Sequence, residues 1–220
     1  MARYLFPRSF NVLSRATIYG GLLIIAFVSW VFGMIWRSSY VTDVGSPVDQ
    51  PVKFSHEHHV SGLGIDCRYC HFTVERSSFA GIPPTQVCMN CHSQLYTTSP
   101  MLAPVRESYR TGQPIPWRRV NNVAGFVNFN HSIHVNKGVG CATCHGRVDR
   151  MPLTWKGAPL TMEWCLQCHR NPAAYVRPRD QVFNMEYQPP PNPSERTELG
   201  KRLVEEYRIE SKTRCSTCHY

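Results

Sequence analysis

The stretch VNFNHSIHVNKGVGCATCH, residues 127–145, repeats a pattern already present at VKFSHEHHVSGLGIDCRYCH, residues 52–71. Each stretch begins with Val-x-Phe-x-His, places a second histidine three residues after the first, and ends on Cys-x-x-Cys-His. Histidines three apart lie on the same side of a helix and can each reach a different metal ion. The pattern predicts a duplicated unit in which one helical turn joins two closely packed metal groups.

Cys-x-x-Cys-His occurs five times in the 220 residues and uses all ten cysteines. It is the attachment sequence of c-type haem, in which both thiols bond to the haem vinyl groups and the histidine binds the iron from the proximal side. The sequence therefore predicts five covalently bound c-type haems. The expected attachment residues are Cys67, Cys70, Cys88, Cys91, Cys141, Cys144, Cys165, Cys168, Cys215 and Cys218. The expected proximal iron ligands are His71, His92, His145, His169 and His219.

Other roles for paired cysteines are open to the sequence. Two Cys-x-x-Cys pairs can form a tetrahedral zinc site, and the spacing between Cys70 and Cys88 would suit one. A single pair can act as a redox-active dithiol, and an even number of cysteines can form a disulfide framework. None of these roles needs a histidine directly after the second cysteine, whereas all five pairs have one. The repeated histidine favours haem attachment at all five sites.

Five histidines remain once the proximal ligands are assigned. The repeat predicts four distal iron ligands, which are His56, His59, His131 and His134. His58 has Ile133 as its counterpart in the second stretch, which favours an exposed position or one near a haem propionate. One haem then needs another distal ligand, and methionine is the usual alternative, although a methionine can equally be a packing residue. The first choice is Met151, followed by Met162, with His58 as the histidine alternative and Met101 and Met185 behind them.

The formal charge of +9 at pH 7 would by itself suit a nucleic acid or an anionic lipid surface. Ten propionates on five haems change this charge to about −1 in the reduced protein, and ferric iron raises it to about +4 in the oxidised protein. Much of the lysine and arginine excess is therefore expected to balance propionates. The sequence predicts no nucleic-acid partner.

Residues 16–36, ATIYGGLLIIAFVSWVFGMIW, contain no charged side chain. A helix of about 20 such residues is long enough to cross the hydrocarbon core of a bilayer. Three arginines precede the stretch, so the positive-inside bias places residues 1–15 in the cytoplasm and the remainder outside. A cleaved signal peptide has a shorter apolar core followed by small residues, which the following WRSSYVTDVG does not provide. The sequence predicts an uncleaved, single-pass anchor.

Beyond the anchor the chain holds 16 of its 17 prolines and shows little strand alternation, which predicts short helices and coil. The clearest longer helix is expected over about residues 194–210, because Leu199, Leu203 and Tyr207 recur at helical spacing after QPPPNP. The expected organisation is a linker at 37–51, a first di-haem module at 52–126, a second at 127–187, and a C-terminal helix with the fifth haem site at 188–220.

The chain resembles the pentahaem cytochrome c subunit of bacterial alternative complex III along nearly its whole length. The resemblance rests on FSHEHH, GIDCRYCH, FAGIPPT before CMNCH, HGRVDRMP, MEWCLQCHRNP, and LVEEY before the final CSTCH. The pattern His-x-x-His before Cys-x-x-Cys-His is also shared with small multihaem cytochromes of the c3 and c7 type. These likenesses imply a mainly α and coil fold with a haem-dominated core. Two c3/c7-like di-haem modules and a fifth haem would follow one transmembrane helix.

The resemblance also implies a place in a respiratory chain. The subunit would relay electrons within a quinol-oxidising complex of the bacterial cytoplasmic membrane, from an iron–sulfur subunit to a periplasmic electron carrier or oxidase. Integral membrane subunits and the lipid bilayer would be its other partners, and the haem region would be periplasmic. The chain would then be an electron-transfer subunit without a catalytic residue of its own.

Two other functions remain open from the sequence. A stand-alone membrane quinol dehydrogenase would need a quinone pocket beside a single helix, which offers little surface. A multihaem reductase, such as a nitrite or hydroxylamine reductase, would need one haem with an open coordination position. None of the five attachment motifs has its histidine replaced, and bis-histidine haems leave no open position for a substrate. The sequence therefore favours electron transfer.

Overall fold

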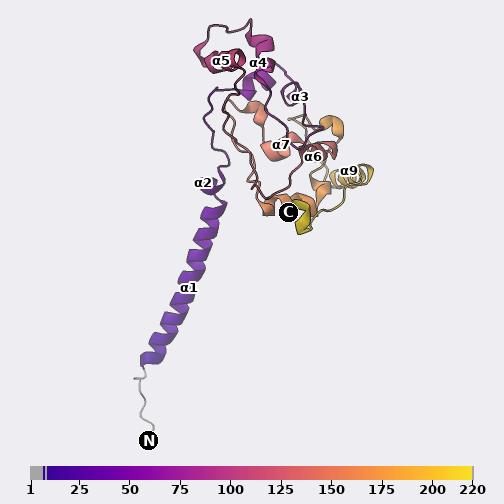
Figure 1. The fold of residues 1–220 in the computed structure, drawn as a ribbon. Coiled ribbons are helices and arrows are strands. Elements are labelled where there is room, and N and C mark those ends of the chain that lie inside the picture. Colours follow the sequence, from indigo (N-terminus) through magenta and orange to yellow (C-terminus); the bar gives the residue numbers. More distant parts are fainter. Residues whose placement is uncertain (1–6, 8, 220) are drawn as a thin grey trace. The chain divides into compact units, whose positions relative to one another are not determined.

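The computed structural model of the chain describes residue 7 and residues 9–219. The chain forms two units, Met1–Asp43 and Val44–Tyr220. Arg3 and Arg8, two of the three arginines behind the predicted topology, lie outside the described residues. Each unit is considered by itself below, and Figure 1 traces both.

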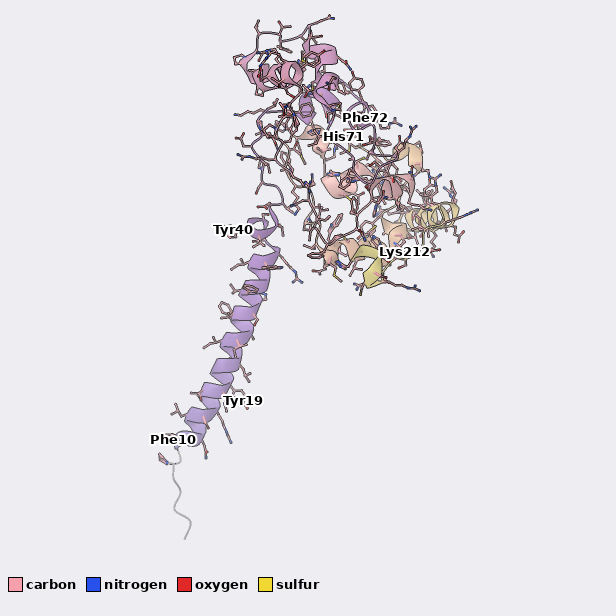
Figure 2. The ribbon with its side chains drawn as sticks, in the orientation of Figure 1. Phe10, Tyr19, Tyr40, His71, Phe72 and Lys212 are labelled. Carbon is pink, nitrogen blue, oxygen red and sulfur yellow. The ribbon has the colours of Figure 1, made fainter. Side chains whose placement is uncertain are left out.

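The first unit is dominated by one long helix, α1 (Ser9–Arg37), drawn in indigo in Figure 1. Its most apolar window has a mean hydropathy of 2.2, and none of that window is buried within the chain. Figure 2 shows Phe10 and Tyr19 among its side chains. The helix starts before and ends one residue after the predicted stretch at 16–36. By length and composition it can cross a membrane, and a leader sequence would pass the same test.

The second unit consists of short helices joined by long irregular segments, as the sequence predicts (Figure 1). Within residues 9–219, extended backbone pairs only at isolated bridges and forms no strand. The α-helices after α1 are α2 (Ser39–Thr42), α3 (Cys67–Cys70), α4 (Thr85–His92), α5 (Ala103–Thr111), α6 (His131–Asn136), α7 (Cys141–His145), α8 (Met162–Arg170), α9 (Pro193–Glu206) and α10 (Cys215–Cys218). The π- or 3-10 turns are η1 (Glu57–Gly62), η2 (Pro100–Leu102), η3 (Val148–Arg150), η4 (Pro172–Ala174) and η5 (Arg179–Gln181).

Each Cys-x-x-Cys-His motif lies on its own helical turn. We number them in sequence order as motif I (67–71, α3), motif II (88–92, α4), motif III (141–145, α7), motif IV (165–169, α8) and motif V (215–219, α10). Polar side chains fix the beginnings of two of these helices, where Asp66 accepts from the amide of Arg68 and Thr161 accepts from the amide of Trp164. The prediction that short helices carry the motifs is confirmed.

The two histidine pairs lie on turns that are wound differently. His131 and His134 are on the α-helix α6, whereas His56 and His59 are at the start of η1, which is a π-turn. The spacer from the second histidine to the first cysteine is one residue longer in the first stretch than in the second. A π-turn takes up one extra residue, so it lets both histidine pairs meet their motifs in a similar way.

The predicted C-terminal helix is α9, which ends at Glu206, four residues earlier than expected. Asn192 caps its first turn by accepting from the amide of Ser194, and Pro193 occupies the first helical position. Leu203 and Tyr207 are buried. Gly200 lets α9 approach η4 closely, because a Cβ there would lie 2.0 Å from the carbonyl oxygen of Ala173.

Protein side chains alone build little core in the second unit. The described residues form two clusters of three buried residues each, namely Val52, Val105 and Ile115, and Val74, Val135 and Val182. Large apolar side chains around motif I stay exposed instead, including Phe72, Phe79 and Ile82. Figure 2 shows Phe72 beside His71. Exposed apolar patches of this kind indicate surfaces that bind an apolar partner.

Candidate functional site

The ten cysteines form no disulfide with one another. Their thiols are free, and among residues 9–219 no three His, Cys, Asp or Glu side chains converge as a metal cluster. Burial raises the pKa of Cys141 to about 11 and that of Cys144 to about 12. Redox-active dithiols have a lowered pKa, so these thiols are not suited to that role.

Three of the four predicted distal histidines each face one motif histidine, and His56 lies within electrostatic range of both His71 and His145. The imidazole centroids of His131 and His145 are 6.3 Å apart with nearly parallel planes, at 9°. The pair His134 and His169 is 6.1 Å apart, and the pair His59 and His92 is 6.2 Å apart. His56 interacts electrostatically with His71, the histidine of motif I. The second histidine of each stretch thus lies opposite the histidine of the next motif along, and His131 lies opposite the histidine of the motif in its own stretch.

These separations fit one haem iron between each pair. Two imidazoles that bind one metal ion from opposite sides, with bonds of about 2.0 Å and ring centres about 1.1 Å behind the nitrogen, have centroids about 6.2 Å apart. The three measured distances, 6.1 to 6.3 Å, match this value. The exposed aromatic side chains of Phe72 and Phe79 beside motif I suit an apolar ring such as a porphyrin. The residues present therefore fit c-type haem.

One phenylalanine holds each histidine pair. Phe54 stacks on His59 at 4.4 Å and meets His56 edge-on at 4.9 Å. Phe129 stacks on His134 at 4.7 Å and meets His131 edge-on at 4.7 Å. The two phenylalanines are the third residue of each repeat, so the Val-x-Phe-x-His pattern signals them in the sequence. Their role as a wedge that fixes both ring planes was not predicted.

Hydrogen bonds select the nitrogen that is left for the iron. In the equivalent second histidines, Nδ1 donates to a backbone carbonyl, which is Ser55 O at 2.8 Å from His59 and Asn130 O at 2.7 Å from His134. His71 Nδ1 has the same arrangement with Gly81 O at 2.7 Å. A histidine whose Nδ1–H donates in this way presents Nε2 to the metal and becomes more basic. The ligands are thus oriented by the folded chain.

Four half-buried histidines are held in the neutral form that binds metal. Burial is the main cause that lowers the pKa of His56 to about 4 and that of His145 to about 4, and neighbouring imidazoles add to it. Burial also lowers the pKa of His59 and of His134. A metal ligand must be deprotonated at the binding nitrogen. These four side chains need no proton loss near pH 7 before they bind an iron.

The histidine of motif V has different surroundings. The ring described next to His219 is Phe126, with centroids 5.6 Å apart. His58 is exposed and lies against His59, far along the chain from motif V. Met151 is 1% exposed, and its carbonyl oxygen accepts from the amide of Glu57, beside the first histidine pair.

Met162 is the methionine candidate on the helix that carries motif IV. It is 64% exposed and begins α8, one turn before Cys165. The thiol of Cys165 is within electrostatic range of Cys218 in motif V. Met101, on η2, is also exposed, whereas Met185 is buried.

Comparison with known proteins points to the same chemistry. Residues 127–220 match the family described as cytochrome c7 and related cytochrome c. A curated relative, the menaquinone reductase multihaem cytochrome c subunit of Nitratidesulfovibrio vulgaris (strain Hildenborough), is 34% identical over 125 residues, which is 56% of this chain and 53% of the relative. The chain therefore spans about half the length of this relative. These matches support a multihaem c-type cytochrome that takes part in electron transport, and neither of them names alternative complex III.

Proposed function

We propose that this multihaem c-type cytochrome is a membrane-anchored electron-transfer subunit that carries five covalently attached haems. The proposal rests on one observation, the facing of histidine pairs at the separation of two imidazoles on one metal ion. A pair of this kind leaves no coordination position for a substrate. It therefore suits electron relay better than catalysis at the iron.

A bound haem supplies one-electron chemistry at its iron. The chain supplies the framework for that chemistry. Each cysteine pair would hold a haem through two thioether bonds, and each histidine pair would supply two ligands to its iron. Phe54 and Phe129 prevent rotation of the imidazoles. Carbonyl acceptors on Nδ1 make the ligands more basic, which favours ferric iron and lowers the potential. Because the chain holds these ligands in place, a change in the oxidation state of an iron would require little rearrangement of the side chains.

The proposed ligand set gives each of the five irons one proximal and one distal ligand. The proximal ligands are His71, His92, His145, His169 and His219, and the distal ligands of motifs I to IV are His56, His59, His131 and His134. For the fifth iron we place Met162 ahead of Met151 and His58. Met162 begins α8, whose Cys165 is within electrostatic range of Cys218 in motif V. His58 lies against His59, and Met151 lies beside Glu57 and Gly146. The modules at 52–126, 127–187 and 188–220 remain part of this proposal.

A membrane complex that exchanges electrons with a quinone is the proposed setting. The curated relative is named as a menaquinone reductase subunit, and the family resemblance is to alternative complex III, which oxidises quinol. In a complex like alternative complex III, an iron–sulfur subunit would donate electrons to this chain, and a periplasmic carrier or oxidase would accept electrons from it. Both settings need integral membrane subunits that bind the quinone. The direction of electron flow is the difference between them.

The proposed location follows from α1. An uncleaved α1 would anchor the chain in a bacterial cytoplasmic membrane, with residues 1–15 in the cytoplasm and the haem region in the periplasm. This orientation places the relay on the side where periplasmic carriers are found. The same helix, if removed as a leader, would release the second unit, so the N-terminus of the mature chain is part of the test.

The decisive experiment is spectroscopy and redox titration of the purified holoprotein. Electron paramagnetic resonance of the oxidised protein should show only six-coordinate, low-spin haem. A five-coordinate, high-spin haem in the native protein would favour the reductase alternative. Quinol oxidation by the chain without partner subunits would favour the stand-alone dehydrogenase. In the isolated complex, rapid mixing with quinol should reduce these haems if the complex oxidises quinol, whereas a menaquinone reductase should oxidise the reduced haems when quinone is added.

A further inference from the structure

The order of the five motifs in space differs from their order in the sequence. The first contact joins motifs II and I. Asn90 and Tyr69 are residues between the cysteines of these two motifs, and Asn90 Nδ2 donates to the hydroxyl of Tyr69 at 3.0 Å. The thiols of Cys70 and Cys88 are within electrostatic range of one another. Motif II thus contacts motif I in two ways. Among the described residues, motif II has no such contact with motif III.

Motif I meets motif III on its other side. Cys67 and Cys141 are within electrostatic range, and so are the motif histidines His71 and His145. The Arg68 guanidinium lies 4.6 Å from the centroid of the Phe183 ring. Phe183 and Cys141 both pack against the buried cluster around Val182. Motif I therefore sits between motifs II and III.

Reciprocal hydrogen bonds join the two repeats at this point. The amide that follows His56 donates to the carbonyl of the sixth residue after motif III, from Glu57 N to Met151 O at 3.2 Å. The amide that follows His131 donates to the carbonyl of the sixth residue after motif I, from Ser132 N to Ser77 O at 3.2 Å. Each repeat therefore donates the same hydrogen bond to the other, as two copies of one chain do at a two-fold interface.

The imidazoles take part in the same exchange. His131 Nδ1 and Ser78 O are 3.0 Å apart, and His56 Nδ1 and Thr154 Oγ1 are 3.1 Å apart. Each repeat thus orients the first distal histidine of the other. Met151 and Ser77 occupy equivalent positions, which gives Met151 a role in this interface through its backbone. The two repeats therefore contact one another through the regions around motif I and motif III, which are the first motifs of the two repeats.

Motif III is in turn connected to motif IV, and motif IV to motif V. The thiol of Cys144 is within electrostatic range of Cys165 and Cys168, and α6 carries a ligand for motif III and one for motif IV. Cys165 is in turn close to Cys218, and Ser211, just before motif V, donates to the carbonyl of His169 at 2.7 Å.

We propose that the five haems form an unbranched row in the order II, I, III, IV, V. The inference rests on the proposed function, because it requires a haem on every motif. The haems of motifs II and V are then the two ends of the relay and the places of exchange with partners. The haem of motif I, although first in the sequence, is an inner member that carries every electron between them.

A matched pair of variants tests the order in the holoprotein. His56→Met and His59→Met change the distal ligand of motifs I and II and should each raise the potential of one haem. A haem that is reduced earlier also shifts the apparent potentials of its immediate neighbours, because charges on nearby irons interact. The titration is followed haem by haem through the haem-methyl resonances. His56→Met should shift two other haems, and His59→Met should shift one. The opposite pattern overturns the order.

A second measurement needs no variant. In the native holoprotein, nuclear Overhauser contacts should join the haem of motif III to that of motif I. Contacts of the haem of motif III with that of motif II, and none with that of motif I, overturn the order as well. Five haems by mass with that second pattern leave the proposed function intact. Fewer than five covalent haems contradict the proposed function, and the five-haem row with it.

Discussion

Gly157 offers a sharp test of how the fold positions an iron ligand. A Cβ added at Gly157 would lie 2.3 Å from the backbone carbon of His145 and 2.4 Å from its carbonyl oxygen. Carbon atoms in good contact are about 3.5 to 4.0 Å apart. Gly157→Ala therefore has to push the backbone of motif III away by more than about 1 Å. No side-chain rotation can relieve the clash, because the atoms that it meets belong to the backbone.

The size of this displacement decides the expected effect. Metal–ligand distances are held within about 0.2 Å, so a shift of about 1 Å at His145 is large enough to disturb its facing of His131, which is now at 6.3 Å and 9°. Overpacking in a close-packed region costs about 1 to 3 kcal/mol. We expect the stability of Gly157→Ala to fall by about this amount and one low-spin haem signal to change.

The assay combines denaturant unfolding with electron paramagnetic resonance of the oxidised holoprotein. Gly62→Ala is the matched control, because its Cβ would meet only the Glu57 carbonyl oxygen at 3.6 Å, an ordinary contact. The control should keep every haem signal. If Gly157→Ala unfolds at the same denaturant concentration as Gly62→Ala and keeps all five signals, the close approach of residue 157 to motif III does not position His145, and the reasoning fails.

Three further predictions concern the haem count, the fifth ligand and the anchor. The mature chain should weigh five haems more than its sequence and keep its N-terminal segment; mass spectrometry that finds four haems or a start beyond residue 36 contradicts this. Met162→Leu should remove a His–Met signature and Met162→His should lower one potential, because thioether favours ferrous iron more than imidazole does. Met151→Leu and His58→Ala are the controls, and loss of the signature in either one moves the ligand there. Protease added outside spheroplasts should digest the haem region and spare about the first fifteen residues, whereas protected haem peptides would reverse the topology.

The sequence by itself determined the chemistry of the sites. Cysteine and histidine at fixed spacing are local features, and one helical turn is enough to bring Cys67 and Cys70 to the same side with His71 next to them. The same argument reaches the histidine pairs, because residues three apart share a helix face. The membrane-length helix and the helix before motif V also follow from local hydrophobic pattern.

Tertiary structure decided which groups meet. The sequence contains four predicted distal histidines of the same type, and nothing local states that His59 faces His92 of motif II while His134 faces His169 of motif IV. The contact between the two repeats depends on bonds such as Glu57 N to Met151 O, between residues far apart in the chain. Met151 illustrates the difference. A methionine before proline in a loop predicts an iron ligand, and that remains a prediction. Its burial and the hydrogen bond that its carbonyl accepts are set by long-range packing, which a local pattern does not encode.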